Sequence, residues 1–143
     1  MKPFEKFVFR ANRPNGNWIN WRIGSGWFAV AGIDNRIDDV IAFLKAAASA
    51  SDENRLFGIR LVPEPHNPND ENAIKVMGIA AAKRGELKTW HIGYVPRQIA
   101  ENVAAFYDPR VIAAELKQAK IGDHKIYVSI AGLIAKGTIE RTS

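Results

Sequence analysis

Two short segments of the chain carry most of the residue types that could hold an anionic ligand. Residues 67–72 place Asn69 and Asp70, two short hydrogen-bonding side chains, in a proline-braced turn. Residues 93–97, Gly-Tyr-Val-Pro-Arg, bring Tyr94 and Arg97 to the start of a predicted helix, where free backbone amides suit a phosphate. An aromatic ring, a guanidinium and fixed polar groups together are typical of a pocket for the end of a nucleotide chain.

A purely structural interpretation of the same residues is the alternative. In it, residues 67–72 only build a turn and Tyr94 only packs against its neighbours. For Asn67, Pro68 and Asn72 we prefer this structural interpretation, because asparagine and proline are common turn formers.

A metal-dependent nuclease is the second chemistry to weigh, because Asp70 followed by Glu86 and Lys88 resembles an Asp…Glu-x-Lys arrangement. Glu86 directly follows the Lys-Arg-Gly turn at 83–85, so it belongs at the tip of a hairpin whose base lies near Asp70. A strand of about ten residues would separate the two carboxylates by about 30 Å. The nuclease therefore remains a weak third hypothesis, and we expect no enzymatic activity.

Other motifs give little support to a cofactor or a metal. Residues 24–29 have the residue types of the G-x-G-x-x-G/A dinucleotide-binding motif, but a strand rather than a helix is predicted to follow them. The three histidines, His66, His91 and His124, share no helical spacing, and the chain has no cysteine for a thiolate site or a disulfide. We therefore expect no cofactor and no metal.

The polar segments are set among predicted strands and helices that do not alternate regularly. Apolar runs and turn residues predict strands at 27–33, 56–62, 73–77 and 87–95, and a final hairpin with arms 111–121 and 125–134. Apolar residues at three- and four-residue spacing predict helices at 36–50 and 97–107, the second beginning after Pro96. The order β-α-β-β-β-α-β-β predicts a mainly β chain with two helices (α+β), built as a small curved sheet or partly open six-stranded barrel.

The first 26 residues look irregular and basic, so we predict an N-terminal extension at 1–26 and a domain at 27–143. We expect Trp18 and Trp21 to attach this extension to the domain by burying the apolar surface of their side chains. The net charge of +5 is concentrated at the two ends of the chain, which suits an anionic partner but would also serve solubility alone. The chain shows no signal peptide, no apolar run of membrane-spanning length and no cysteine, so we expect no membrane association and a cytoplasmic location.

The longest motif resembles the HIRAN family. The matching residues are Glu64-Pro65-His66-Asn67-Pro68-Asn69-Asp70-Glu71-Asn72-Ala73-Ile74-Lys75-Val76 and Gly93-Tyr94-Val95-Pro96-Arg97. The resemblance covers about residues 27–134 and implies an OB-like β-barrel with two helices. It also implies a DNA-binding module in DNA repair or processing that binds single-stranded DNA or DNA ends, with Asp70 facing a 3′ hydroxyl.

Four residues bear on the match to the family pattern. Asp34 and Asn35 stand where an aromatic pair is common, Asn69 replaces a tyrosine, and Tyr94 stands where some members have histidine. Loss of stacking rings would weaken capture of a strand end, so a protein-interaction module on the same fold stays open as the alternative.

For the nucleic-acid hypothesis we expect Lys75 and Arg97 to contact phosphates, Tyr94 to stack, and Asn69 and Asp70 to bind the terminal sugar or base. Tyr127, on the final hairpin, is a replacement stacking surface. The full set of candidate binding residues is Asn35, Arg36, Asn69, Asp70, Lys75, Tyr94, Arg97 and Tyr127.

Overall fold

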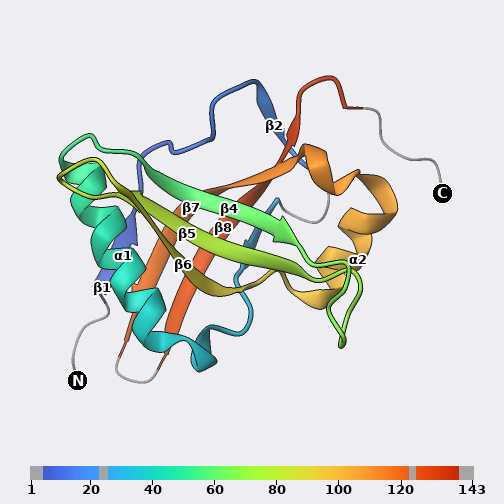
Figure 1. The fold of residues 1–143 in the computed structure, drawn as a ribbon, viewed down its shortest axis with the longest axis horizontal. Helices are drawn as coiled ribbons and strands as arrows, with labels where there is room; N and C mark the ends of the chain where they lie inside the picture. Colours follow the sequence, from blue (N-terminus) through green and yellow to red (C-terminus); the bar gives the residue numbers. More distant parts are fainter. Residues whose placement is uncertain (1–4, 23–25, 123–124, 139–143) are drawn as a thin grey trace.

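One continuous antiparallel sheet makes up most of the molecule, and two helices pack on it (Figure 1). The computed structural model describes residues 5–22, 26–122 and 125–138. The strands are β1 (Glu5–Val8), β2 (Trp18–Asn20), β3 (Trp27–Ala29), β4 (Phe57–Pro63), β5 (Ile74–Ala81), β6 (Leu87–Tyr94), β7 (Ile112–Ile121) and β8 (Ile126–Ala135). The helices are α1 (Ile37–Asp52) and α2 (Arg97–Phe106), with short 3-10 helices at Ile33–Asn35 and Pro109–Val111.

The strands follow the order β2-β8-β7-β4-β5-β6, with β1 paired to β7 and β3 paired to β8. The sheet curls until β6 approaches the chain just after β3. There Ala31 and Tyr94 exchange two backbone hydrogen bonds of 2.8 Å each, in a single isolated bridge. This one bridge joins the two sides of the curl, so the fold is a partly open, OB-like barrel, as predicted from the sequence.

One part of the core lies between α1 and the sheet, and another part includes Ala100 and Val103 of α2. Every second residue of β5 is buried, which explains its alternating sequence. The apolar stripe of α1, including Val40, Phe43 and Leu44, is fully buried and packs against β5 and β6. Gly78 permits this close approach, because a Cβ at that position would lie 2.5 Å from the Phe43 ring.

The two predicted helices, the β5–β6 hairpin and the final β7–β8 hairpin are confirmed to within a few residues. Three predictions need correction. Residues 5–22 are not irregular throughout, since β1 and β2 are strands of the main sheet. The strand predicted at 27–33 ends at Ala29, and a 3-10 helix begins at Ile33. The described residues therefore contain eight strands rather than six.

Trp21 attaches the N-terminal segment to the sheet. Only 3% of its surface is exposed, and its ring stacks on Phe28 at a centroid distance of 5.6 Å. Gly132 of β8 makes room for it, because any side chain there would overlap the indole. The expectation that a tryptophan pins this segment is confirmed for Trp21, while Trp18 is only half-buried.

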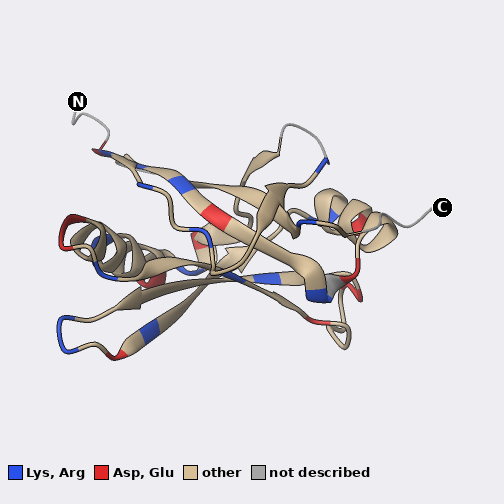
Figure 2. Cartoon of the chain, turned by 90° about the horizontal axis from the view of Figure 1, so that it is seen from above, with Lys and Arg blue, Asp and Glu red and all other residues tan. Residues whose placement is uncertain are grey.

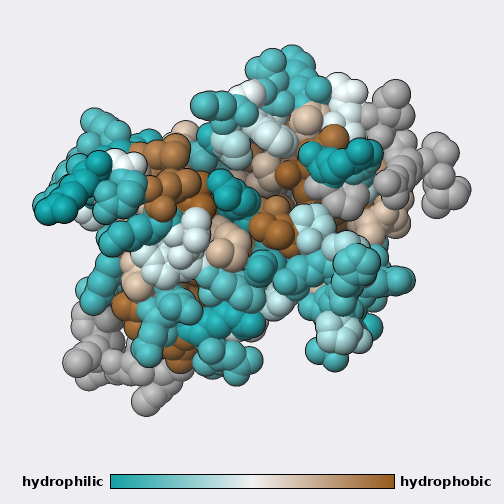
Figure 3. Space-filling view, in the orientation of Figure 1, coloured by the Kyte–Doolittle hydropathy of each residue, from teal (hydrophilic) through white to brown (hydrophobic). Residues whose placement is uncertain are grey.

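The surface is mixed in character. Hydrophobic residues on the face seen in Figure 3 form small separate groups among hydrophilic ones. Basic and acidic residues are dispersed along the chain in Figure 2 rather than gathered on one side. None of the helices in the described ranges is long and apolar enough to cross a membrane.

Candidate nucleic-acid interface

The loop between β4 and β5 is held in shape by its own polar side chains. Asn67 Oδ1 accepts hydrogen bonds from the backbone amides of Asn69 (2.9 Å) and Asp70 (3.2 Å). Its Nδ2 donates to Glu64 Oε1 at 3.1 Å, and the amide of Asn72 donates to Asp70 Oδ1 at 2.9 Å. The prediction that Asn67 builds the turn is therefore confirmed, and the turn fixes the position of Asp70.

The end of β6 faces this loop. Gly93 is required there, because a Cβ on it would lie 2.2 Å from the carbonyl oxygen of Ala31. Tyr94 follows as the last residue of β6, and α2 begins three residues later at Arg97. Pro96 is the N-cap of α2 and makes no side-chain capping bond, so the first-turn amides remain available to an anion.

Together the loop, the end of β6 and the start of α2 form an open cavity of about 430 Å³. Its lining residues are Ala31, Gly32, Arg36, Asn67, Asn69, Asp70, Ala73, Tyr94, Val95 and Arg97. Five of the eight candidate binding residues are thus brought together: Arg36, Asn69, Asp70, Tyr94 and Arg97.

Two cationic side chains, Arg36 and Arg97, line the cavity together with one aromatic ring, that of Tyr94. The Arg36 guanidinium lies 5.4 Å from the Tyr94 ring centroid, and its Nη1 donates to the carbonyl oxygen of Gly32 at 3.0 Å. Arg97 is 72% exposed, and its Nε lies 4.0 Å from Asp70 Oδ2 and 3.6 Å from Glu101 Oε1. Exposed ion pairs of this length contribute little, so a phosphate can compete for Arg97.

A family model described as HIRAN domain matches residues 50–130, more than half of the chain. The chain belongs to the HIRAN family. HIRAN domains are generally DNA-binding modules. Searches of curated proteins and of solved structures gave no match.

The HIRAN match contains β4, the polar loop, β5, β6 and α2, and hence most of the cavity wall. Arg36 and the segment at Ala31 and Gly32 complete the wall from outside the matched range. In this HIRAN domain a guanidinium over Tyr94 therefore comes from a part of the chain that the family match does not cover. Asn69, at the position where a tyrosine is common, is exposed at the rim.

Glu64 and His91 are residues that sequence reasoning did not assign to the site, and both contact Tyr94. Burial, followed by hydrogen bonding with Glu64, raises the pKa of Tyr94, so its hydroxyl stays protonated. The hydrogen bond from Asn67 is the main cause that lowers the pKa of Glu64, which keeps it anionic. The position of Glu64 at the head of the HIRAN motif was the available sequence signal.

His91 packs its ring against Tyr94, edge to face, at 5.1 Å. Its Nε2 lies 3.0 Å from the carbonyl oxygen of Gly93. Burial, and then the charge of Arg36, lower the pKa of His91, so the imidazole is neutral near pH 7. No signal in the sequence marked His91 for this role, because its contact with Tyr94 depends on the conformation of the strand end.

The remaining candidates lie outside the cavity lining. Lys75 pairs with Glu64 at 3.7 Å, and Glu64 in turn hydrogen-bonds with Tyr94. Asn35 is exposed on the 3-10 helix before α1. Tyr127, 45% exposed on β8, lines a different cavity.

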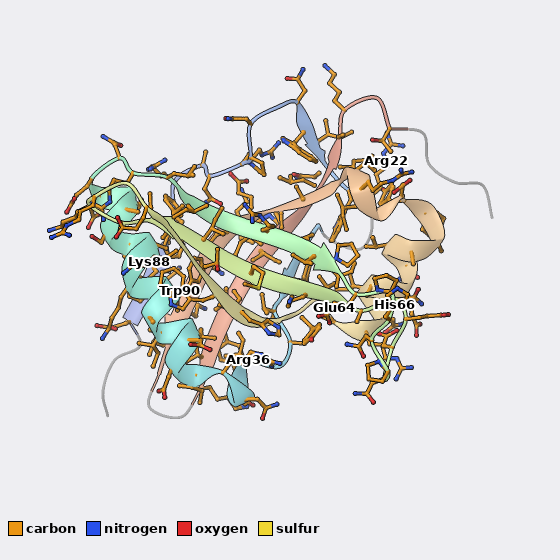
Figure 4. All side chains as sticks on the ribbon, viewed as in Figure 1. Arg22, Arg36, Glu64, His66, Lys88 and Trp90 are labelled. Carbon is orange, nitrogen blue, oxygen red and sulfur yellow. The ribbon has the colours of Figure 1, made fainter. Side chains whose placement is uncertain are left out.

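The residues of the nuclease hypothesis are separated as predicted. Asp70 lies just before β5, and its backbone carbonyl accepts a hydrogen bond from the amide of Ala73. Glu86 lies just after β5, and its backbone carbonyl accepts a hydrogen bond from the amide of Ala82. Figure 4 shows Lys88 near the opposite end of the sheet from Glu64, which belongs to the polar loop. The described residues contain no group of three or more His, Asp or Glu side chains placed to hold a metal ion.

Proposed function

We propose that this HIRAN domain binds single-stranded DNA by its end in the 430 Å³ cavity. The observation that carries the proposal is one cavity lined by the Tyr94 ring with the Arg36 guanidinium over it, by Arg97 at an uncapped helix start, and by the carboxylate of Asp70. Stacking, phosphate neutralisation and a hydroxyl acceptor are the three interactions that an exposed strand end requires.

Each residue has a distinct part in this proposal. Arg97 and the first amides of α2 bind the terminal phosphates, and Tyr94 stacks on a base. Asp70 Oδ1 already accepts a hydrogen bond from the amide of Asn72. The other oxygen, Oδ2, faces Arg97 and is the one that accepts a hydrogen bond from a terminal hydroxyl. Asn69 reaches the sugar or base from the rim.

We also propose a binding role without catalysis, in DNA repair or processing and in the cytoplasm. Among the described residues that line the cavity, Asp70 is the one carboxylate, whereas two-metal or acid–base hydrolysis uses several acidic groups. The net positive charge favours an anionic partner.

Fluorescence anisotropy with labelled single strands tests the proposal. Strands with a free and with a phosphorylated 3′ end are titrated at two salt concentrations. We expect Tyr94→Ala to weaken binding by about 5- to 150-fold, which corresponds to one stacked base. We expect Arg97→Ala to reduce the slope of log K against log salt by about 0.7.

Two further variants sharpen the result. Asp70→Asn keeps an acceptor for the Asn72 amide but should remove the preference for a free 3′ hydroxyl. Arg60→Ala, an exposed arginine on β4 that does not line the cavity, is the matched control and should bind normally.

Absence of binding at low salt would contradict the proposal and favour the protein-interaction role on the same fold. Equal affinity for free and blocked ends would keep single-strand binding but remove end recognition.

A further inference from the structure

A second cavity, of about 560 Å³, lies on the outer face of the sheet where β1, β7 and β8 run side by side (Figure 1). Its lining residues are Lys6, Gln118, Ala119, Lys120, Tyr127 and Ser129. They combine two ammonium groups, one aromatic ring and neutral polar side chains, and none of these described lining residues is acidic.

Three of these side chains form a row directly across the sheet. Lys6 of β1 is opposite Lys120 of β7, and Lys120 is opposite Tyr127 of β8. All three are exposed. Directly opposed residues of antiparallel strands project from the same face, so the row is a continuous strip.

The pairing of Lys6 with Lys120 is unfavourable on its own. Like charges directly opposite each other in a sheet destabilise it. Among the described residues, no carboxylate forms an ion pair with either ammonium group. A bound anion would relieve this repulsion, and Tyr127 at the end of the row offers a ring on which a base can stack.

The strip adjoins the first cavity through the short segment at residues 30–31. The amide of Val30 donates to the carbonyl of Val128, the neighbour of Tyr127, at 2.9 Å. On the other side, Ala31 is bridged to Tyr94. Two strand spacings of about 4.8 Å therefore separate the backbones of Tyr94 and Tyr127 by about 10 Å.

We propose that a single-stranded DNA held by its end at Tyr94 continues across residues 30–31 onto Tyr127, Lys120 and Lys6. In this path a base stacks on Tyr127 and phosphates contact the two lysines. The DNA crosses β8, β7 and β1 at a steep angle to these strands. More nucleotides therefore contact the protein than the first cavity alone can hold. This inference rests on the proposed function and adds the direction in which the bound strand leaves the cavity.

The test compares two lengths of single-stranded DNA, because only the longer one reaches the strip. Oligonucleotides of about 3 and about 12 nucleotides lie below and within the range of about 4–16 nucleotides that one OB fold covers. For the longer strand we expect Tyr127→Ala to weaken binding by at least about 5-fold. We expect the double variant K6A/K120A to lower the slope of log K against log salt by about 1.4.

For the shorter strand, both changes should leave affinity and salt dependence as in the unmodified protein. Tyr94→Ala should weaken both lengths. Lys83→Ala, at the tip of the β5–β6 hairpin and outside both cavities, is the matched charge control and should change neither. Thermal unfolding of the K6A/K120A protein should show no loss of stability, since the substitution removes a like-charge pair.

The two proposals fail in different ways. If both lengths bind equally well and the strip variants have no effect on either, the path over β8, β7 and β1 is wrong and end binding stands. If the strip variants weaken binding of the longer oligonucleotide while Tyr94→Ala changes binding of neither length, the first cavity is not the binding site. Both the proposed function and this path are then wrong. If the stably folded protein binds neither length at low salt, both proposals are wrong.

Discussion

Gly93 shows how a single residue can serve both the fold and the cavity. The bridge between Ala31 and Tyr94 is the link that joins β6 to the chain after β3, and Gly93 lies beneath it. A Cβ on Gly93 would meet the Ala31 carbonyl oxygen at 2.2 Å and the Val30 side chain at 2.6 Å. Since Ala31 and Tyr94 also line the cavity, a disturbance at Gly93 reaches the ligand site directly.

We therefore expect Gly93→Ala to lower the free energy of unfolding by about 1–3 kcal/mol, the usual cost of overpacking. It should also weaken binding of the short oligonucleotide, because the Tyr94 ring moves. Gly85→Ala is the control: no atom lies within 4 Å of its added Cβ, so it strains only a turn. Chemical denaturation and anisotropy measure the two effects, and normal binding by a folded Gly93→Ala protein would contradict this account.

At the scale of the elements, β7 anchors the N-terminal segment on the edge between its pairing with β4 at Ala114 and its pairing with β1, which reaches Gln118. The side chain of Asn12 both donates to the Leu116 carbonyl and accepts from the Leu116 amide, at 2.8 Å each. The adjacent Glu115 is buried, and it accepts from the Asn12 amide at 3.1 Å and from Lys117 Nζ at 2.7 Å. A polar network thus supplies hydrogen bonds to β7 where neither β4 nor β1 pairs with it.

The charge of Glu115 should make this anchor sensitive to acid. Burial by itself would raise the pKa of Glu115, but the hydrogen bonds from Lys117 and Asn12 and the nearby cations hold it below its ordinary value. A lowered pKa in the folded state contributes stability above the pKa of an unfolded glutamate, about 4.3, and this contribution is lost as the pH falls through the lower, folded value.

We expect Glu115→Gln to cost about 1.5–3 kcal/mol at neutral pH, the range for a hydrogen bond to a charged group. The difference from the unmodified protein should shrink as the pH drops below about 4. Urea denaturation at several pH values measures it, with the exposed Glu86→Gln as control. A difference that stays constant down to low pH would show that the charge of Glu115 has no part in the anchor.

At the scale of the whole molecule, the N-terminal segment contributes residues to the core. Phe9 and Trp21 are both buried, and Phe9 packs against Phe57 of β4 at a ring distance of 5.7 Å. The core therefore includes residues that precede both the HIRAN match and the predicted domain boundary at residue 27.

We expect a chain that lacks residues 1–22 to lose cooperative folding. Removal of one buried aromatic side chain costs about 3–5 kcal/mol, and two such losses approach the 5–15 kcal/mol stability of a typical domain. Circular dichroism during heating tests this expectation. A chain that lacks only residues 1–4, ahead of β1, is the control, and a sharp, unshifted unfolding transition in the longer deletion would contradict the prediction.

The sequence alone determined the helices, the long hairpins and the meeting of Asp70, Tyr94 and Arg97. These features depend on local periodicity, on turns such as 83–85, and on a motif whose two halves flank one hairpin. Tertiary structure decided the rest. The strand pairs of β1 and β2, the cation over Tyr94 and the row from Lys6 to Tyr127 all join segments far apart in the chain. A three- or four-residue segment becomes a strand only when a partner edge accepts its hydrogen bonds, and no local pattern records where that edge will be.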